Sequence, residues 1–221
     1  MADERFWRKN ARRYDRSIHL LNRRFPQMVD MVVQDLGQCG EVLEIAAGTG
    51  LVSLPLARAV PNLVVTDLSS EMLAIARGRL NEGGLTQVES RQADALNLEF
   101  PDASFDGLVA ANILHLLPDV DRALAEWKRV LRPGGLLCVP TFLHAQTLTA
   151  QAVSRVLGLV GFPIVTRFRA NDLVRVVQRH GFSVERTAVI PGPLPLIHLL
   201  GRATGSMSDA PAPQKSDPPR L

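Results

Sequence analysis

The chain has 221 residues, of which 46% are hydrophobic and 21% are charged, and its formal net charge is +3. These values are typical of a globular protein with one domain-sized core, and they exclude a collagen-like chain or a disordered chain of low hydrophobicity. No window is apolar and uncharged over the length that a membrane span needs, and the arginine-rich start lacks the apolar run of a secretory signal, so we expect a cytoplasmic protein.

The first forty residues have the periodicity of helices. Phe6, Trp7, Tyr14 and Ile18 belong to an apolar stripe with spacings near three and four. Eight basic residues lie between positions 5 and 24, against a single acidic one. A proline at position 26 and a glycine at position 37 are typical of the two ends of a second helix. The sequence therefore predicts basic amphipathic helices over residues 1–37.

From residue 41 onwards, short apolar strands alternate with helical segments. We expect strands over residues 42–46, 62–66, 88–92, 105–111 and 136–139. We expect helices over residues 51–60, 70–82, 120–131, 146–160 and 170–180, with Ser69 or Ser70 as the cap of the second one.

The extended runs 182–190 and 194–200 are joined by a Pro-Gly-Pro turn, which can connect only antiparallel neighbours. The pattern predicts an α/β fold, doubly wound and Rossmann-like, with a mostly parallel seven-stranded sheet that ends in this antiparallel hairpin. It divides the chain into N-terminal helices (1–37), a ligand-binding domain (38–202) and a disordered tail (203–221) rich in Ser, Pro, Asp and Ala.

Four sequence features follow the first four predicted strands. They are the turn Gly48-Thr49-Gly50, then Asp67, then Asp94-Ala95, and then the run from Asn112 to His115. Ligands of open α/β sheets bind at the carboxyl ends of the strands. Bare glycine backbone lets a ligand approach closely, and a carboxylate accepts both hydroxyl protons of a ribose. Each feature alone has an ordinary explanation as a turn, a helix cap or a loop, but together they predict a cofactor that contains a nucleoside.

The residue at position 53 distinguishes between two such cofactors. A dinucleotide site prefers a third glycine there, for close helix–strand packing and a pyrophosphate at the helix terminus. Ser53 stands at this position. The NAD interpretation is therefore weakened, although it stays an alternative.

The runs VLEIAAGTG, VVTDLSSEMLAIAR, QADALNLEFPDASFDGLVAANILHLLPD and LRPGG, within residues 41–140, resemble the class I S-adenosylmethionine (SAM)-dependent methyltransferases. The nearest likeness is to the branch that holds the ubiquinone/menaquinone biosynthesis C-methyltransferases. The resemblance implies SAM as the cofactor and S-adenosylhomocysteine as its product. It implies that the methionine part is held by Glu44, Ala46, Gly48, Thr49 and Gly50, the ribose by Asp67, the adenine by Leu68, Met72, Asp94 and Ala95, and the sulfonium end by Asn112. The family usually has glycine where Ala46 stands.

Three side chains are candidates for a direct part in catalysis. A general base is needed only when the acceptor loses a proton before it is methylated. His115 and His144 each follow a predicted strand at the ligand-binding edge, and Tyr14 resembles an aromatic residue that many relatives fold over the site. The alternatives are a pocket or surface imidazole for each histidine and a place in the helix's apolar stripe for Tyr14.

The chain contains two cysteines, Cys39 and Cys138, and no CxxC pair or Cys/His cluster. Metal sites and disulfide frameworks are recognised in a sequence by such local spacing. The sequence therefore predicts no metal site, and both thiols are expected to be small buried hydrophobic groups.

The N-terminal segment offers a clue to the methyl acceptor. Apolar residues opposite a basic face suit a helix that lies on an anionic membrane surface, and the run 193–200 is apolar too. Membrane contact on the inner face would fit a small or lipid acceptor such as a quinone precursor or a phospholipid headgroup. The alternative is a lid that packs on the domain. No nucleic-acid-binding module is recognisable. A SAM-binding module without turnover and an NAD-dependent oxidoreductase remain the alternative functions.

Overall fold

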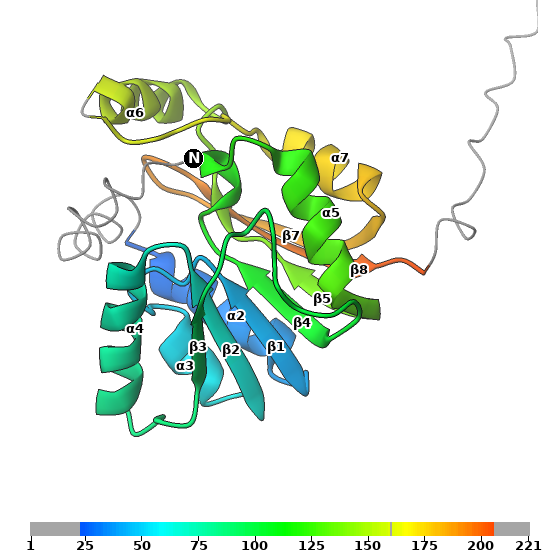
Figure 1. Cartoon of the computed structure of the whole chain (residues 1–221). Helices are drawn as coiled ribbons and strands as arrows, with labels where there is room; N and C mark the ends of the chain where they lie inside the picture. Colours follow the sequence, from blue (N-terminus) through cyan, green and yellow to red (C-terminus); the bar gives the residue numbers. More distant parts are fainter. Residues whose placement is uncertain (1–22, 160, 206–221) are drawn as a thin grey trace, which may run out of the picture.

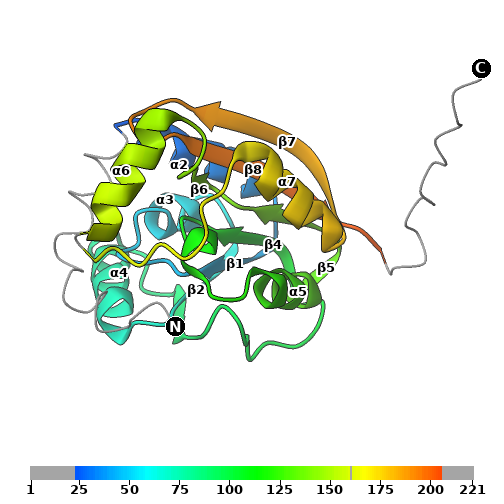
Figure 2. The ribbon, with the colours of Figure 1, turned by 90° about the horizontal axis from the view of Figure 1, so that it is seen from above.

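The computed structural model describes residues 23–159 and 161–205 (Figure 1). A twisted sheet runs through the centre of the molecule, with helices on both of its faces (Figure 2). The basic segment 1–22, which includes Tyr14, and the tail 206–221 lie outside the described residues. Their predicted roles as lid, membrane contact and disordered tail therefore stay predictions.

The described residues form one eight-stranded sheet, with the order β3-β2-β1-β4-β5-β8-β6 and with β7 paired to β8. The strands are β1 (Glu41–Ile45), β2 (Asn62–Asp67), β3 (Glu89–Gln92), β4 (Phe105–Ala110), β5 (Leu131–Cys138), β6 (Thr141–Phe142), β7 (Phe182–Ile190) and β8 (Leu196–Ala203). Strands β1 to β5 are parallel to one another, whereas β8 is antiparallel to β5, β6 and β7.

The short strand β6 follows β5 along the same side of β8. Cys138 pairs with Leu200, and Thr141 pairs with Ile197 after the chain has passed Pro140. Proline cannot donate a hydrogen bond to a sheet ladder, so it divides this strand into two. The sheet thus has seven strand positions, and the predicted doubly wound, mostly parallel architecture with a C-terminal antiparallel hairpin is confirmed.

The helices cover the two faces of the sheet. They are α2 (Phe25–Leu36), α3 (Ser53–Ala57), α4 (Ser70–Glu82), the 3-10 helix η1 (Leu114–Leu116), α5 (Val120–Val130), α6 (Leu148–Leu159) and α7 (Ala170–Arg179). Helices α2, α3 and α4 share one apolar cluster with Val42 of β1, and α5 and α7 share the other with Leu43. Successive residues of a strand face opposite sides of a sheet, so β1 contributes to both cores.

Local sequence signals explain where several helices begin. The Ser69 hydroxyl accepts a hydrogen bond from the Met72 backbone N–H, so Ser69 is the cap of α4. Asp119 caps α5 in the same way through the Arg122 backbone N–H. Pro26 stands in the first turn of α2, as predicted, and Met28 and Leu36 of that helix are fully buried against the sheet. Helix α3 is shorter than the predicted range 51–60.

The apolar run 193–200 contributes to the predicted hairpin strand, and its apolar side chains do not form the surface that membrane contact would need. Leu196, Ile197 and Leu199 have no exposed area, because β8 lies inside the sheet with β5 and β6 on one side and β7 on the other. The apolar surface lies instead on α6, where Leu148 is 84% exposed and Leu159 is 87% exposed. Within the described residues, no helix has the length and apolar character of a membrane span.

Candidate cofactor pocket

One pocket lies at the carboxyl ends of the parallel strands, and all four predicted features reach it. Gly48 follows β1, Asp67 ends β2, Asp94 follows β3 and Asn112 follows β4, and all of them line the pocket. The remaining lining residues are Ile45, Ala46, Leu68, Ser69, Met72, Ala93, Ala95, Leu96, Ala111, Ile113, Leu116, Leu117 and Pro118. The strand ends therefore meet as the parallel topology requires.

The turn after β1 is held in a left-handed backbone conformation. The φ angles of Ala46 and Gly48 are 53° and 58°. A side chain in this region is strained, which gives a physical reason for the glycine that the family usually has at the position of Ala46. Gly50 does not line the pocket: a Cβ there would lie 3.1 Å from the Cα and Cβ atoms of Ala76 in α4. Gly50 thus permits the close approach of α4.

Asp67 joins the ends of β1 and β2. Its Oδ2 accepts a 2.7 Å hydrogen bond from the Gly48 backbone N–H, and its Oδ1 accepts a 2.8 Å bond from the Ser69 N–H. Burial raises the pKa of this carboxyl, while hydrogen bonds from the backbone N–H groups of Ser69, Gly48 and Leu68 oppose that rise. A carboxylate has about four lone-pair sites, so it keeps capacity to accept a further hydrogen bond from a ligand.

Glu44 places a buried carboxyl under the same turn. Its side chain has no hydrogen-bond partner within the described residues, although the residue is only 1% exposed. Burial raises the pKa of Glu44 to about 8, the nearby Ser53 hydroxyl opposes this rise, and the negative charge of Asp67 adds a smaller contribution to it. An unsatisfied buried acceptor is unfavourable unless a ligand brings a donor. The α-ammonium of SAM is a donor of this kind, so the residue fits the cofactor that the sequence implies.

Asn112 presents a second buried acceptor. Its φ is 56°, a conformation that asparagine tolerates better than most residues, and its backbone N–H donates a 2.7 Å bond to the Pro140 carbonyl. Its side-chain Oδ1 has no partner within the described residues and belongs to a residue that lines the pocket. An amide oxygen that can accept a hydrogen bond from a ligand therefore lies just after β4.

The loop after β3 is held by one hydrogen bond within the loop and by another from helix α5. Asp94 accepts a 2.9 Å bond from the Leu96 N–H, and the indole N–H of Trp127 donates a 3.0 Å bond to the Ala95 carbonyl. Trp127 is fully buried in α5. These bonds hold the part of the pocket wall that Asp94 and Ala95 form, where the sequence predicts the adenine. Sequence reasoning had not singled out Leu116, Leu117 and Pro118, which complete the lining although they belong to the quoted run NILHLLPD.

His115 and His144 lie side by side, but neither lines the pocket. Their ring centroids are 4.8 Å apart, and the Nδ1 atom of His115 lies 3.0 Å from the Thr141 hydroxyl. Neither ring nitrogen of His144 has a partner within the described residues. Burial lowers the pKa of both, that of His144 to about 4. Both imidazoles are therefore neutral near pH 7, and they suit hydrogen bonding to an acceptor better than retention of a proton.

Comparison with known proteins places this pocket in a family. Residues 43–139 match the model of a methyltransferase domain. The chain is 46% identical over 97 residues to a phosphatidylethanolamine N-methyltransferase of Cereibacter sphaeroides, which covers 43% of this chain and 47% of that protein. It is 36% identical over 166 residues to a demethylmenaquinone methyltransferase of Thermobifida fusca, which covers 71% of this chain and 68% of that protein.

The fold is also known from solved structures. The YcgJ protein of Bacillus subtilis superimposes with a TM-score of 0.71 over 81% of this chain and 99% of that one, at 18% sequence identity. A likeness at this identity shows the fold alone. The match to the relative from Cereibacter sphaeroides spans about half the length of that protein.

These matches agree with the geometry of the pocket and decide between the cofactors. A turn with Ser53 in place of a third glycine, an unpaired buried carboxyl at Glu44 and a carboxylate at Asp67 that lines the pocket fit SAM. The methyltransferase relatives support the same cofactor and leave the NAD interpretation without support. The chain belongs to the SAM-dependent methyltransferases.

Proposed function

We propose that the protein transfers the methyl group of SAM to a lipophilic acceptor that reaches the pocket from a membrane surface. Two of the relatives carry names of enzymes that methylate phosphatidylethanolamine and demethylmenaquinone. Both acceptors join a long apolar part to a polar group that carries the nucleophile. The proposal adopts this shared chemistry and leaves the choice between the two to experiment.

Residues of the pocket lining, together with the buried Glu44 beside it, act on the cofactor by binding and orienting it. In this proposal Glu44 holds the ammonium, Asp67 the ribose hydroxyls and Asn112 the region of the sulfonium. When bound, SAM supplies an activated methyl group, whose bond to sulfur breaks as the acceptor atom bonds to the methyl carbon, leaving S-adenosylhomocysteine. The chain contributes alignment of the acceptor and exclusion of water.

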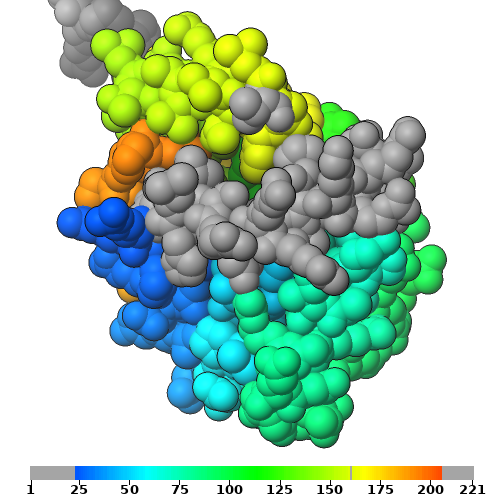
Figure 3. Space-filling model, turned by 90° about the vertical axis from the view of Figure 1, so that its left-hand side faces the viewer, coloured from blue at the N-terminus to red at the C-terminus, as the bar shows by residue number. Residues whose placement is uncertain are grey.

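The observation that best supports a lipid acceptor is the exposed apolar surface of α6. Leu148, Val156 and Leu159 are all more than half exposed, and α6 projects from the body of the molecule (Figure 3). The segment after α6 is attached next to the pocket, because the backbone N–H groups of Val165 and Thr166 each donate a 3.0 Å bond to the His115 carbonyl. An exposed apolar helix beside a pocket suits an apolar chain or a membrane interface.

In this proposal the buried imidazoles lie next to the polar group of the bound acceptor. His144 has two ring nitrogens without a partner in the described residues, and its ring centroid lies 4.8 Å from that of His115, which is followed along the chain by Leu116 of the pocket lining. In this proposal His144 gives or accepts one hydrogen bond with the acceptor's polar group. The proton that the acceptor loses on methylation goes to solvent, because burial disfavours the charged imidazolium.

Methyl transfer from labelled SAM tests the proposal. The acceptors are phosphatidylethanolamine vesicles, vesicles that carry a reduced demethylated naphthoquinone, and a water-soluble amine and phenol. We expect labelled product in one of the two vesicle arms, and the arm identifies the acceptor. Product only in the water-soluble arm would contradict a lipid acceptor. Tight SAM binding by calorimetry with no transfer in any arm would favour a SAM-binding module without turnover.

A further inference from the structure

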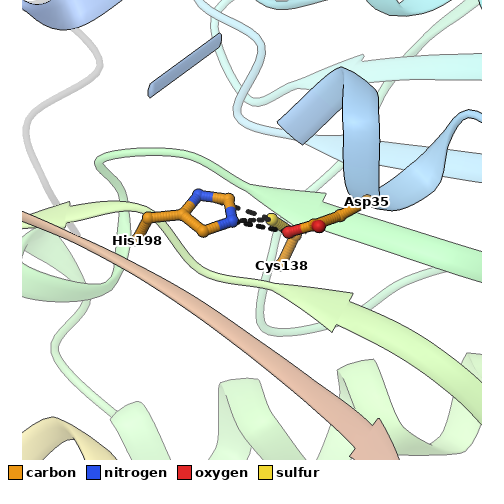
Figure 4. A group of neighbouring side chains, drawn as sticks. All are labelled: Asp35, Cys138 and His198. Carbon is orange, nitrogen blue, oxygen red and sulfur yellow. Dashed lines mark hydrogen bonds and ion pairs between the residues drawn. The ribbon is translucent and has the colours of Figure 1, made fainter. Parts of the chain in front are cut away.

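Three side chains with metal-binding atoms meet in a buried cluster that the cofactor pocket does not use. Asp35 comes from α2, Cys138 from the end of β5 and His198 from β8 (Figure 4). Their ligand atoms all lie within 4.8 Å of one another, and it is the one such group in the part of the chain that the structure describes. None of the three lines the cofactor pocket. The cluster is therefore a separate feature of the molecule.

The imidazole of His198 contacts both other groups. Its Nε2 lies 2.7 Å from Oδ2 of Asp35 and 3.7 Å from the Sγ of Cys138, whereas Nδ1 lies 3.9 Å from that sulfur. In a nucleophile–histidine–acid triad, opposite nitrogens of the ring contact the acid and the nucleophile. Here Nε2 contacts the acid, and the sulfur lies almost equally far from both nitrogens, so Cys138 does not take the nucleophile's place in such a triad. Figure 4 shows the three side chains gathered in one place, within reach of a single ion.

The separations are close to those of a zinc site. Bonds of about 2.3 Å to sulfur and about 2.0 Å to nitrogen and oxygen place tetrahedral ligand atoms roughly 3.3–3.6 Å apart. The Nε2–Sγ distance of 3.7 Å already lies near this range. The Nε2–Oδ2 distance of 2.7 Å would lengthen by roughly half an ångström as the shared hydrogen gives way to the metal. The side chains of Cys138 and His198 also rotate in this proposal, so that the sulfur and the Nε2 lone pair face the same ion.

The surroundings orient these ligands and leave a route to them. Arg186 of β7 forms an ion pair with Oδ1 of Asp35, which leaves Oδ2 directed at the cluster. A partner that holds the second atom of a ligating group is typical of metal sites. Cys138 and His198 have no exposed area, whereas the side chain of Arg186 is 42% exposed. Access from solvent is therefore on the Asp35 side.

We propose that Asp35, Cys138 and His198 bind a zinc ion that ties α2 to β5 and β8. Thiolate, imidazole and carboxylate together favour zinc among common cellular cations. Cys138 loses its proton to solvent on binding, and a water molecule completes the tetrahedron. The sequence predicted no metal site because local spacing was its only guide, and these residues stand 60 and 163 positions apart along the chain. The ion has a structural role and takes no part in methyl transfer.

Cobalt substitution tests the site without reference to activity. The full chain, freed of metal by a chelator, is titrated with Co²⁺ and then with Zn²⁺. We expect one equivalent to bind, with the intense near-ultraviolet absorption of a thiolate–cobalt bond and displacement by zinc. Cys138→Ser should remove that absorption and weaken zinc binding at least about tenfold. Cys39→Ser is the matched control, because Cys39 is also buried and lies outside the cluster, and it should behave as the wild type.

Two further outcomes decide against the site. If the folded wild-type chain binds no stoichiometric metal, the cluster is a metal-free network in which Asp35 pairs with Arg186 and His198. If cobalt absorption persists in Cys138→Ser, the metal lies elsewhere. Thermal unfolding provides a second measurement when Cys138→Ser folds poorly: zinc should raise the melting temperature of wild type and Cys39→Ser. No rise in either would also overturn the proposal.

Discussion

The backbone N–H of Gly48 donates a 2.7 Å hydrogen bond to Oδ2 of Asp67. The turn after β1 and the carboxylate at the end of β2 therefore hold each other in place before any ligand binds. Asp67 has two tasks in our interpretation, because the same carboxylate organises the turn and accepts the ribose hydroxyls. The first prediction follows from this double role.

Replacement of Asp67 by alanine should lower the affinity for SAM by about tenfold to a hundredfold, since charge-assisted hydrogen bonds are lost. Calorimetric titration of SAM measures the change, and circular dichroism with thermal unfolding establishes that the variant is folded. An unchanged dissociation constant in a folded variant would show that the ribose lies elsewhere.

Ala46→Gly should stabilise the protein and alter SAM binding. The left-handed φ of 53° is unfavourable for alanine by roughly 1 kcal/mol, partly offset by the greater freedom of glycine in the unfolded chain. Ala103→Gly is the matched control, because Ala103 has a φ of 52° and is exposed outside the pocket. Chemical denaturation should show a similar gain for both, and calorimetry should show a changed SAM affinity for Ala46→Gly alone. Equal SAM affinity in the two variants would remove Ala46 from the cofactor site.

Glu44→Gln should change how stability depends on pH. The carboxyl keeps its proton up to about pH 8 in the folded chain, against a pKa of 4.5 in its ordinary state. The unfolded chain then binds fewer protons than the folded one between these values, so the free energy of unfolding falls as pH rises through this window. The variant lacks this loss and should be more stable than wild type at pH 7, by on the order of 1–4 kcal/mol.

The same residue predicts a pH dependence of cofactor binding. The ammonium of SAM favours ionised Glu44, so binding releases a proton, and wild-type affinity should rise from about pH 6 towards about pH 8. Glu44→Gln should bind more weakly and lose this rise. Denaturation and calorimetry over the pH range measure both effects. Parallel pH profiles for the two proteins would contradict the assignment.

His144→Leu should lower methyl transfer without lowering the stability of the fold. The substitution removes two buried ring nitrogens that lack partners in the described residues, so the free energy of unfolding should stay level or rise by roughly 1 kcal/mol. SAM affinity should not change, whereas methyl transfer to the lipid acceptor should fall at least about tenfold, as expected when a buried hydrogen bond to substrate is lost. Full activity would show that the imidazole does not contact the acceptor.

Substitutions on the exposed face of helix α6 should reduce methyl transfer only to acceptors in a membrane. Leu148→Gln combined with Leu159→Gln removes most of the exposed apolar area and should reduce transfer to vesicle-borne acceptor several-fold, while a short-chain soluble analogue reacts as before. Val189→Gln is the control, since Val189 is 47% exposed but lies on β7. Vesicle flotation measures binding in parallel. A similar loss with the soluble analogue would indicate damage to the pocket instead.

Much of the fold could be predicted because local signals and topology agree. The runs that became β1, β2 and β4 are short and mostly apolar, which is typical of strands buried on both faces, and each is followed or ended by a polar or glycine signal. Because parallel strands end at one edge, knowing that Gly48, Asp67, Asp94 and Asn112 follow strands was enough to bring them together.

What could not be predicted depends on contacts between distant residues. The run 193–200 was predicted as a hairpin strand, and its apolar character was also considered to suit membrane contact. A continuous apolar strand is equally typical of a buried position, and only the pairing of β8 with β5 decides between the two. The contact of Asp35 with His198 spans 163 residues and has no local signal. The sequence likewise could not predict that the carboxyl oxygens of Glu44 lack a hydrogen-bond partner, because burial depends on the folded structure.

The position of β8 has a consequence for the order in which the protein is assembled. Among the described elements this strand leaves the ribosome last, yet it lies inside the sheet and joins β5 to β7. Until residue 203 has emerged, the edge of β5 stays open, and neither His198 nor its bond to α2 is available. Exposed strand edges invite aggregation. A released chain that ends before Leu196 should therefore be a substrate for chaperones, while one that ends after Ala203 should not.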